Sequence, residues 1–482
     1  MIGKTGFRIR SVWFAALVTS AIAVVASCGG GGGGGVVGSG GTGRAASVTV
    51  GTVNGFGSVI VDGLVYDDHS ATVVKETAPG VDAIAEVLLG HRVSVEYEVA
   101  GVASLVRVEA TIAGTVAAVT APGRFSVLGQ TVTVNASGAV GPITQLGGGY
   151  AQAGDVKVGD PIEIHGILVR QNGAYSVQAT RIDRLVAAPA YLRVTGLASS
   201  VATAGGGSLN LGALSVDTSA STVLPLGSVL VDGQALTVLA LPSSLTTAAN
   251  GMPRLKAVQT RVRQLGSGDA DANVSGSVSQ LDPGAKTFVL GSLVVRYANA
   301  SLSPAGAVPA NGSYVLARGP SAADGSLNAS AVTLRDTGSD GEGELKGNIS
   351  GYVAATKRFL VRGVMVDASA ASIQGCPANG LADGLFVEVH GGLVSAGVMA
   401  KTVQCESESS GATVERTGVG SAVDTSAKTL TLTPRTGSPV SVKWSDTTFF
   451  GDVTPQTLAG KSLHVEGQLN GAVLSASKIE LD

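Results

Sequence analysis

Hydrophobic and polar residues alternate along most of the chain after residue 47. Segments such as Val132-Thr133-Val134 and Val387-Glu388-Val389 place apolar side chains on one face and polar side chains on the other, which is the pattern of a half-buried β-strand. Turns rich in Gly, Asp and Asn separate these short segments, and no stretch carries the 3.6-residue period of an amphipathic helix. The pattern therefore predicts an all-β protein.

One order of strands recurs along the chain about every 60–80 residues. Each unit opens with Gly-x-Val or Gly-x-Ile and later reaches an apolar strand that ends in glycine, as in Ile162-Glu163-Ile164-His165-Gly166 and Val387-Glu388-Val389-His390-Gly391. About five short strands per unit can close into a small barrel of the OB type, which hides most strand edges. A chain of small sandwiches and one long β-solenoid are the alternatives, although solenoid repeats are usually shorter than these.

The alternation also predicts which side chains fill the barrels. Thr133, Glu163 and Glu388 should point outward, because successive residues of a strand face opposite sides. The apolar residues between them should form two interiors that do not touch, one in the second unit (Val132, Val134, Ile162 and Ile164) and one in the fifth (Val364, Val366, Val387 and Val389). Phenylalanines that recur at one strand position should belong to such interiors as well: Phe125, Phe288 and Phe359.

About six small five-stranded, OB-like barrels in tandem account for the chain after an amino-terminal leader. We predict a signal peptide at 1–27, a lipidated Cys with a glycine-rich tether at 28–47, and barrels at 48–112, 113–190, 191–266, 273–335, 345–406 and 414–482. Units this small bury only about 60% of the surface of their unfolded chain, so neighbouring barrels should pack against each other.

The amino terminus carries an export signal rather than a part of the fold. Lys4, Arg8 and Arg10 precede an apolar run over 12–26, which is too short for a helix that spans a bilayer. The block Val25-Ala26-Ser27-Cys28 resembles the lipobox of bacterial lipoproteins. That resemblance implies that Cys28 becomes the first residue, carries acyl groups such as palmitate, and anchors the protein to a membrane. A cleaved signal peptide with an incidental Cys is the alternative.

A flexible tether follows this block. Residues Gly29–Gly35 are all glycine, and such a segment behaves as a random coil. A phosphate-binding loop does not fit, because no Gly-Lys-Ser/Thr sequence ends the run. Gly29 also differs from the Asp of the inner-membrane retention signal in enterobacteria. We therefore expect the outer membrane, with the protein facing the periplasm or the cell surface.

The first unit contains the most distinctive motif of the chain. It reads Gly51-Thr52-Val53-Asn54-Gly55-Phe56-Gly57-Ser58-Val59, followed by Val61-Asp62-Gly63-Leu64. This resembles the opening motif of bacterial lipoproteins built from tandem copies of domain of unknown function 5666, with Asp62 in place of the usual Asn. The resemblance implies a β-barrel repeat lipoprotein of a Gram-negative bacterium. It implies no activity.

Cys376 and Cys405 are predicted to form a disulfide bond. With Cys28 taken by lipid, they are the remaining pair of the three cysteines, and an exported protein folds in an oxidising compartment. A metal pair and a redox thiol are the alternatives. Both usually need a Cys-x-x-Cys spacing or a companion His, and neither lies nearby in the sequence.

No metal centre is predicted, although two acidic segments are calcium candidates. Asp269-Ala270-Asp271-Ala272-Asn273 matches the first half of an EF-hand loop, but Val274 stands where the loop needs Gly, and Gln280 stands where it needs Glu. The other segment contains Asp340 and Glu342. Both segments fall at junctions between units, where a solvated acidic linker is the alternative.

The composition argues against several classes of function but does not identify a ligand. Lys and Arg number 32 against 35 Asp and Glu, a net charge of −3, which argues against a nucleic-acid binder. Aromatic residues make up 4%, which leaves few platforms for sugars. No Gly-x-Ser-x-Gly or His-x-x-x-His motif is present, and His165 and His390 are expected on strand surfaces.

We therefore expect a non-catalytic, membrane-anchored module without a cofactor, with a structural role or a role in binding an unidentified surface ligand. The alternative is an extracytoplasmic hydrolase whose site lies at a junction between barrels.

Overall fold

A computed structural model describes residues 47–481, with gaps at 69, 138–139, 172, 203–206, 267–268, 270, 336–341, 378, 407–412, 434–438, 447, 451–452 and 471–472. The described residues lie in one compact unit, Gly34–Asp482. Apart from two short 3-10 turns, η1 (Ala153–Asp155) and η2 (Pro242–Ser244), their regular elements are all strands. No helix in this part of the chain is long and apolar enough to cross a membrane. The predicted all-β class is confirmed.

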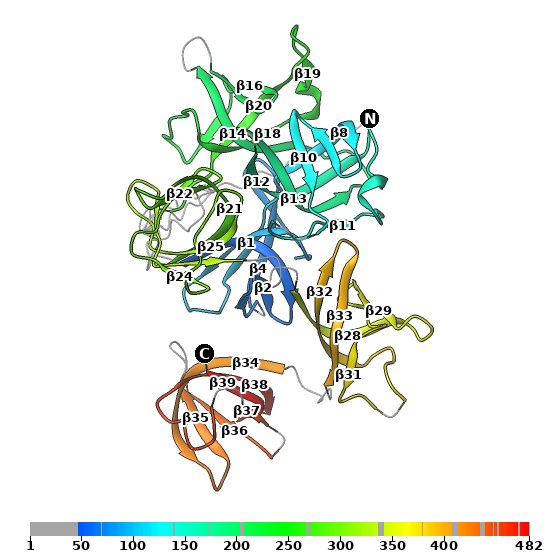
Figure 1. The fold of residues 1–482 in the computed structure, drawn as a ribbon, viewed down its shortest axis with the longest axis vertical. Coiled ribbons are helices and arrows are strands. Elements are labelled where there is room, and N and C mark those ends of the chain that lie inside the picture. Colours follow the sequence, from blue (N-terminus) through cyan, green and yellow to red (C-terminus); the bar gives the residue numbers. More distant parts are fainter. Residues whose placement is uncertain are drawn as a thin grey trace, which may run out of the picture. The chain divides into compact units, whose positions relative to one another are not determined.

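The strands form six successive groups, which we call barrels 1 to 6 (Figure 1). Barrel 1 contains β1 (Ser47–Phe56), β2 (Val59–Val61), β3 (Leu64–Tyr66), β4 (Thr72–Ala78), β5 (Val81–Ile84), β6 (Arg92–Tyr97) and β7 (Leu105–Val108). Barrel 2 contains β8 (Ile112–Ala121), β9 (Arg124–Val127), β10 (Gln130–Val134), β11 (Gln145–Gly147), β12 (Pro161–Gln171) and β13 (Ala174–Arg184). Barrel 3 contains β14 (Leu192–Ala202), β15 (Ser208–Leu211), β16 (Leu214–Asp217), β17 (Thr222–Leu224), β18 (Ala235–Ala240), β19 (Thr246–Thr247) and β20 (Pro253–Val262).

The second half of the chain continues in the same way. Barrel 4 contains β21 (Ala272–Asp282), β22 (Thr287–Leu290), β23 (Leu293–Arg296), β24 (Ser301–Ser303), β25 (Tyr314–Gly319), β26 (Leu327–Asn328) and β27 (Ala331–Leu334). Barrel 5 contains β28 (Glu342–Val353), β29 (Arg358–Val361), β30 (Val364–Asp367), β31 (Ser372–Gln374), β32 (Phe386–Val394) and β33 (Gly397–Glu406). Barrel 6 contains β34 (Thr413–Asp424), β35 (Thr429–Thr433), β36 (Val440–Lys443), β37 (Phe449–Phe450), β38 (Ser462–Asn470) and β39 (Val473–Leu481).

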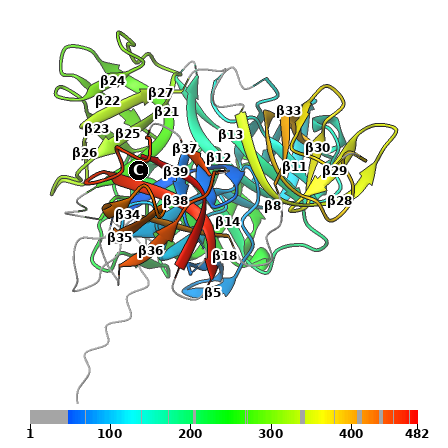
Figure 2. The ribbon, with the colours of Figure 1, turned by 90° about the horizontal axis from the view of Figure 1, so that it is seen from below.

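Barrels 2, 3, 5 and 6 each close through a ring of five strands in the same order. In barrel 2 the ring runs β8–β9–β10–β13–β12 and returns to β8. Every pair in it is antiparallel except β10–β13, in which Val132 lies opposite Val177 in a parallel pair. Figure 2 shows the strands of the equivalent ring in barrel 6, β34–β35–β36–β39–β38. A closed five-stranded ring of this kind is OB-like, as predicted.

The predicted interiors are confirmed. The four apolar residues named for the second unit share one core, the four named for the fifth share another, and the two cores are separate. Phe125, Phe288 and Phe359 are among the largest fully buried side chains. Strand alternation therefore placed these side chains correctly.

Neighbouring barrels pack against each other, as predicted, and barrels that are distant in the sequence do so as well. One continuous apolar core contains residues of barrels 1 and 5, and a second contains residues of barrels 2 and 3. Strand β1 pairs in parallel with both β21 and β28, so barrel 1 continues into the sheets of barrels 4 and 5. Gly55 allows the second approach, because a Cβ at this position would lie 2.7 Å from the Glu344 carbonyl oxygen.

Glu163 points out of its barrel, as predicted, but it does not lie in solvent. Its side chain leaves the barrel interior, but barrel 1 covers it, and the residue is only 8% exposed. Lys75 of β4 donates a hydrogen bond of 2.6 Å to the Glu163 carboxylate. The partner cation offsets the cost of burying this charge, and the sequence of one unit could not show it.

Candidate ligand-binding cavity at the barrel junction

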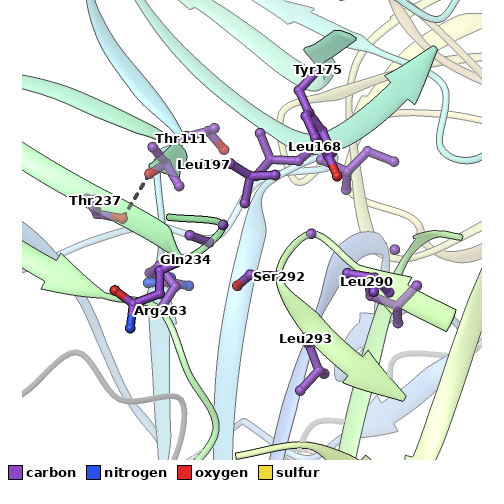
Figure 3. A pocket seen from close by; sticks show the side chains of 18 of the residues that line it. Thr111, Leu168, Tyr175, Leu197, Gln234, Thr237, Arg263, Leu290, Ser292 and Leu293 are labelled. Atoms are coloured by element: carbon purple, nitrogen blue, oxygen red, sulfur yellow. Dashed lines mark hydrogen bonds between the residues drawn. The ribbon is translucent and has the colours of Figure 1, made fainter. Parts of the chain in front are cut away.

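A cavity of about 980 Å³ lies where barrels 1 to 4 meet (Figure 3). Its wall takes Val50 from β1, Thr111 from the link between barrels 1 and 2, Leu168 from β12, Leu197 from β14 and Ser292 from the β22–β23 turn. This volume is at the upper end of the range usual for ligand sites, which often lie between domains. No single barrel could form it.

Leucines line one part of the wall. Leu168, Leu197 and Leu293 are each partly exposed and face the cavity, together with the buried Leu290 (Figure 3). Three barrels contribute these four side chains. An apolar ligand surface placed here would remove exposed leucine from water, which is favourable by about 25 cal/mol per Å² of buried area.

Polar and charged groups form another part of the wall, and they are already paired. Glu109 and Arg263, which belong to the links after barrels 1 and 3, form an ion pair. Burial opposes the charge of Glu109, but Arg263 outweighs it and lowers the pKa of the Glu109 carboxyl to about 2. The hydroxyl groups of Thr195 and Thr237 form a hydrogen bond of 2.9 Å. Glu109 is therefore ionised at neutral pH and cannot act as a general acid.

Longer polar side chains stand around the rest of the cavity. The Arg170 guanidinium lies 5.5 Å from the centre of the Tyr175 ring, and Gln280 donates a hydrogen bond of 3.2 Å to the Tyr175 hydroxyl. Arg92 donates to the Ser275 hydroxyl and carbonyl oxygens at 3.1 Å each. Asp232 accepts a hydrogen bond of 2.8 Å from the Val201 backbone N–H. The wall thus presents hydroxyl, amide and apolar groups, and its charges are largely compensated.

A buried charge cluster joins barrels 1 and 3. The Glu76 carboxylate accepts hydrogen bonds from Arg193 at 3.1 Å, from Arg261 at 3.0 and 2.9 Å, and from Gln259 at 3.0 Å. Although burial alone would raise it, the two arginines lower the pKa of Glu76. Glu76 and both arginines are nearly fully buried, so this cluster fixes how the two barrels meet.

A second polar cluster joins barrels 1 and 4. Tyr314 of β25 donates a hydrogen bond of 2.9 Å to the Asp62 carboxylate, and the Ser275 hydroxyl also binds Asp62. Burial, reinforced by the charge of Asp62, raises the pKa of Tyr314 above its ordinary range. The Asp that departs from the resembled motif is thus a buried contact between barrels.

The structure confirms the predicted disulfide. Cys376 and Cys405 are bonded, with their Cα atoms 4.7 Å apart, and the bond ties the loop after β31 to the end of β33. Cys28, the predicted lipidation site, lies outside the described residues.

Two of the calcium candidates, Asp271 and Asn273, have separate partners inside the protein. Asp271 forms an ion pair with Arg318 at 2.7 Å. The Asn273 amide donates to the Tyr97 hydroxyl at 2.8 Å. Asp269 is 5% exposed, and burial raises the pKa of its carboxyl to about 6. In the second segment, Asp340 and the side chain of Glu342 lie outside the described residues.

The expectation of surface histidines is wrong for His165. This residue is fully buried, and its ring centre lies 4.3 Å from that of His91, between barrels 1 and 2. Burial, with His165 and Arg181 nearby, holds the pKa of His91 well below its ordinary value. His390 is exposed, as expected.

Most of the cavity residues could not be identified from the sequence. Thr111, Leu168, Leu197, Gln234 and Ser292 belong to no shared motif and come from different units. The two oppositely charged residues in the links after barrels 1 and 3, Glu109 and Arg263, could have indicated the cavity. A link that packs between barrels must compensate its charges.

Comparison with known proteins identifies one part of the chain. No curated protein matches the chain. Residues 113–183 match the family model described as "Domain of unknown function (DUF5666)". The match spans barrel 2 from β8 to β13, so this barrel, whose β12 and β13 line the cavity, is a DUF5666 domain.

Proposed function

We propose that this protein is a non-catalytic binding module of the bacterial envelope, and that its ligand occupies the cavity between barrels 1 to 4. The observation that carries this proposal is the cavity itself, with its leucine side and its compensated charges. Such a wall suits an uncharged amphipathic molecule, because a charged ligand would find few unpaired counter-charges there.

The alternative of a hydrolase at a barrel junction has less support. The acidic groups of the cavity wall are engaged: Glu109 with Arg263, Asp232 with a backbone N–H, and Asp324 with Arg296 at 2.6 Å. General acid catalysis near neutral pH usually relies on a carboxyl whose pKa is raised, and Glu109 is shifted in the opposite direction.

The location forms part of the same proposal. Cys28 would carry the lipid anchor, and residues 29–46 would tether barrel 1 to the outer membrane, on its periplasmic or outer face. The other five barrels would be divergent copies of the DUF5666 domain. The strand ring that barrels 3, 5 and 6 share with barrel 2 supports this interpretation.

A fluorescence titration tests the binding site. The probe is N-phenyl-1-naphthylamine, which is uncharged, largely apolar with one N–H group, and bright only in apolar surroundings. Full-length protein should bind it saturably, and Ser292→Trp, which places an indole in the cavity from the β22–β23 turn, should weaken binding at least ten-fold. The matched control is Ser426→Trp in an exposed turn of barrel 6, which should bind like the parent. Equal binding by the parent and Ser292→Trp would refute the proposed site.

A further inference from the structure

Barrel 5 carries a group of metal-ligand side chains that belongs to no site described above. Ligand atoms of Glu344, Glu388 and His390 lie within 4.8 Å of one another. Glu344 is on β28, and the other two residues are on the neighbouring strand β32. We propose that these three side chains bind a divalent transition-metal ion of the zinc type.

The backbone holds the three residues on one face of a paired sheet. Glu344 lies directly opposite His390 in the β28–β32 ladder, and Glu388 lies two residues before His390. Residues two apart on a strand point to the same side, so all three side chains leave the barrel together. Sites built on paired strands are better ordered than sites on loops.

The donor set selects the kind of metal. One imidazole and two carboxylates are typical ligands of zinc, which binds them at about 2.0–2.2 Å in a tetrahedron and can take water as a fourth ligand. Calcium and magnesium prefer oxygen ligands alone and more of them. To bind one ion, the three ligand atoms must move closer together. This needs side-chain shifts on the order of 1 Å.

The charges around the group favour a cation. The side chain of Glu344 makes no hydrogen bond or ion pair with another described residue, and it lies beside the negative Glu388. Lys346 lies 3.4 Å from Glu388 and 3.3 Å from Glu466 of barrel 6. Lys346 can therefore remain with Glu466 when a metal ion takes Glu388.

Barrel 6 supplies a natural comparison. His464, Glu466 and Glu480 also lie within 4.8 Å of one another. There, however, Lys478 contacts both carboxylates, 3.2 Å from Glu466 and 2.9 Å from Glu480, whereas Lys346 contacts only Glu388 of the barrel 5 group. This lysine already supplies the positive charge, so a metal ion would have to displace it. We therefore assign the zinc site to barrel 5 alone.

Calorimetric titration of the full-length, tag-free protein with zinc chloride, after dialysis against a chelator, tests this assignment. The parent should bind zinc saturably, and calcium at least 100-fold more weakly. Glu344→Gln and His390→Gln should each weaken zinc binding at least ten-fold, whereas His464→Gln should change it less than two-fold. Circular dichroism confirms that each variant is folded.

Three results would overturn the assignment: no saturable zinc binding by the parent, unchanged binding by a folded His390→Gln variant, or an equal loss in His464→Gln. The cavity probe is measured separately, so failure here leaves the cavity proposal intact.

Discussion

One position that is glycine in three of the barrels shows how a single residue shapes them. Gly166, Gly391 and Gly467 each follow a His or Glu at a β-bulge, where the pairing register shifts by a residue. A Cβ at any of the three would overlap a backbone carbonyl oxygen of the paired strand. The glycine therefore serves the close approach of two strands.

Replacing Gly391 by Ala should destabilise the protein by about 1–3 kcal/mol, because the paired strand must move away from the added methyl group. Urea unfolding measures the change. Gly154→Ala is the control, since nothing lies within 4 Å of its Cβ position, and it should stay within about 0.5 kcal/mol of the parent. A folded Gly391→Ala variant as stable as the control would contradict the role of the bulge.

Asp269 should make stability depend on pH. Burial raises the pKa of its carboxyl from 3.8 to about 6, so the folded state holds this proton more tightly than the unfolded state does. Stability is then lost as the pH rises from about 4 to about 6. Asp269→Asn removes the charge and should gain about 1–3 kcal/mol at pH 7 but little at pH 4. Urea midpoints at the two pH values check this; an equal gain at both would show that the charge is not the cause.

At the scale of elements, the disulfide holds a loop to the strand that closes barrel 5. It spans 29 residues, and closing a loop of that length stabilises the folded state by about 3.5 kcal/mol in the chain-entropy model. Reductant should lower the unfolding midpoint of the parent accordingly. A Cys376→Ser, Cys405→Ser double variant should start at the lower midpoint and not respond to reductant. A parent insensitive to a reductant shown to open the bond would contradict this.

The Glu76 cluster should matter far more than an exposed pair. Glu76→Gln leaves Arg193 and Arg261 buried without a counter-charge and should cost about 3–5 kcal/mol. Asp324→Asn breaks an ion pair with Arg296 in which both side chains are about half exposed, and it should cost less than about 1 kcal/mol. Chemical unfolding of the two variants checks the order, and equal losses would contradict it.

The elements were predictable from the sequence, because strand alternation is a local signal. Val132 and Ile164 were correctly placed inside a barrel, and the Cys376–Cys405 bond followed from the cysteine count. The burial of Glu163 and His165 was not predictable, because the covering residues, Lys75 and His91, lie about one unit earlier in the chain. A contact between two units produces no periodic pattern in the sequence of either unit.

At the scale of the whole molecule, the contacts between barrels create the features that could carry a function. Barrel 1 is bound to barrel 2 through Lys75, to barrel 3 through Glu76 and to barrel 4 through Asp62. The cavity exists only because these four barrels meet, and its lining comes from segments between residues 50 and 325. A single DUF5666 domain would lack most of this wall.

Hydrogen–deuterium exchange of the full-length protein, with and without N-phenyl-1-naphthylamine, tests most directly whether this shared cavity is the binding site. The predicted result is slower exchange at 166–170, 195–199 and 289–294, one segment from each of barrels 2, 3 and 4, and no change in barrels 5 and 6. Slower exchange confined to one barrel, or found only in barrels 5 and 6, would contradict the account.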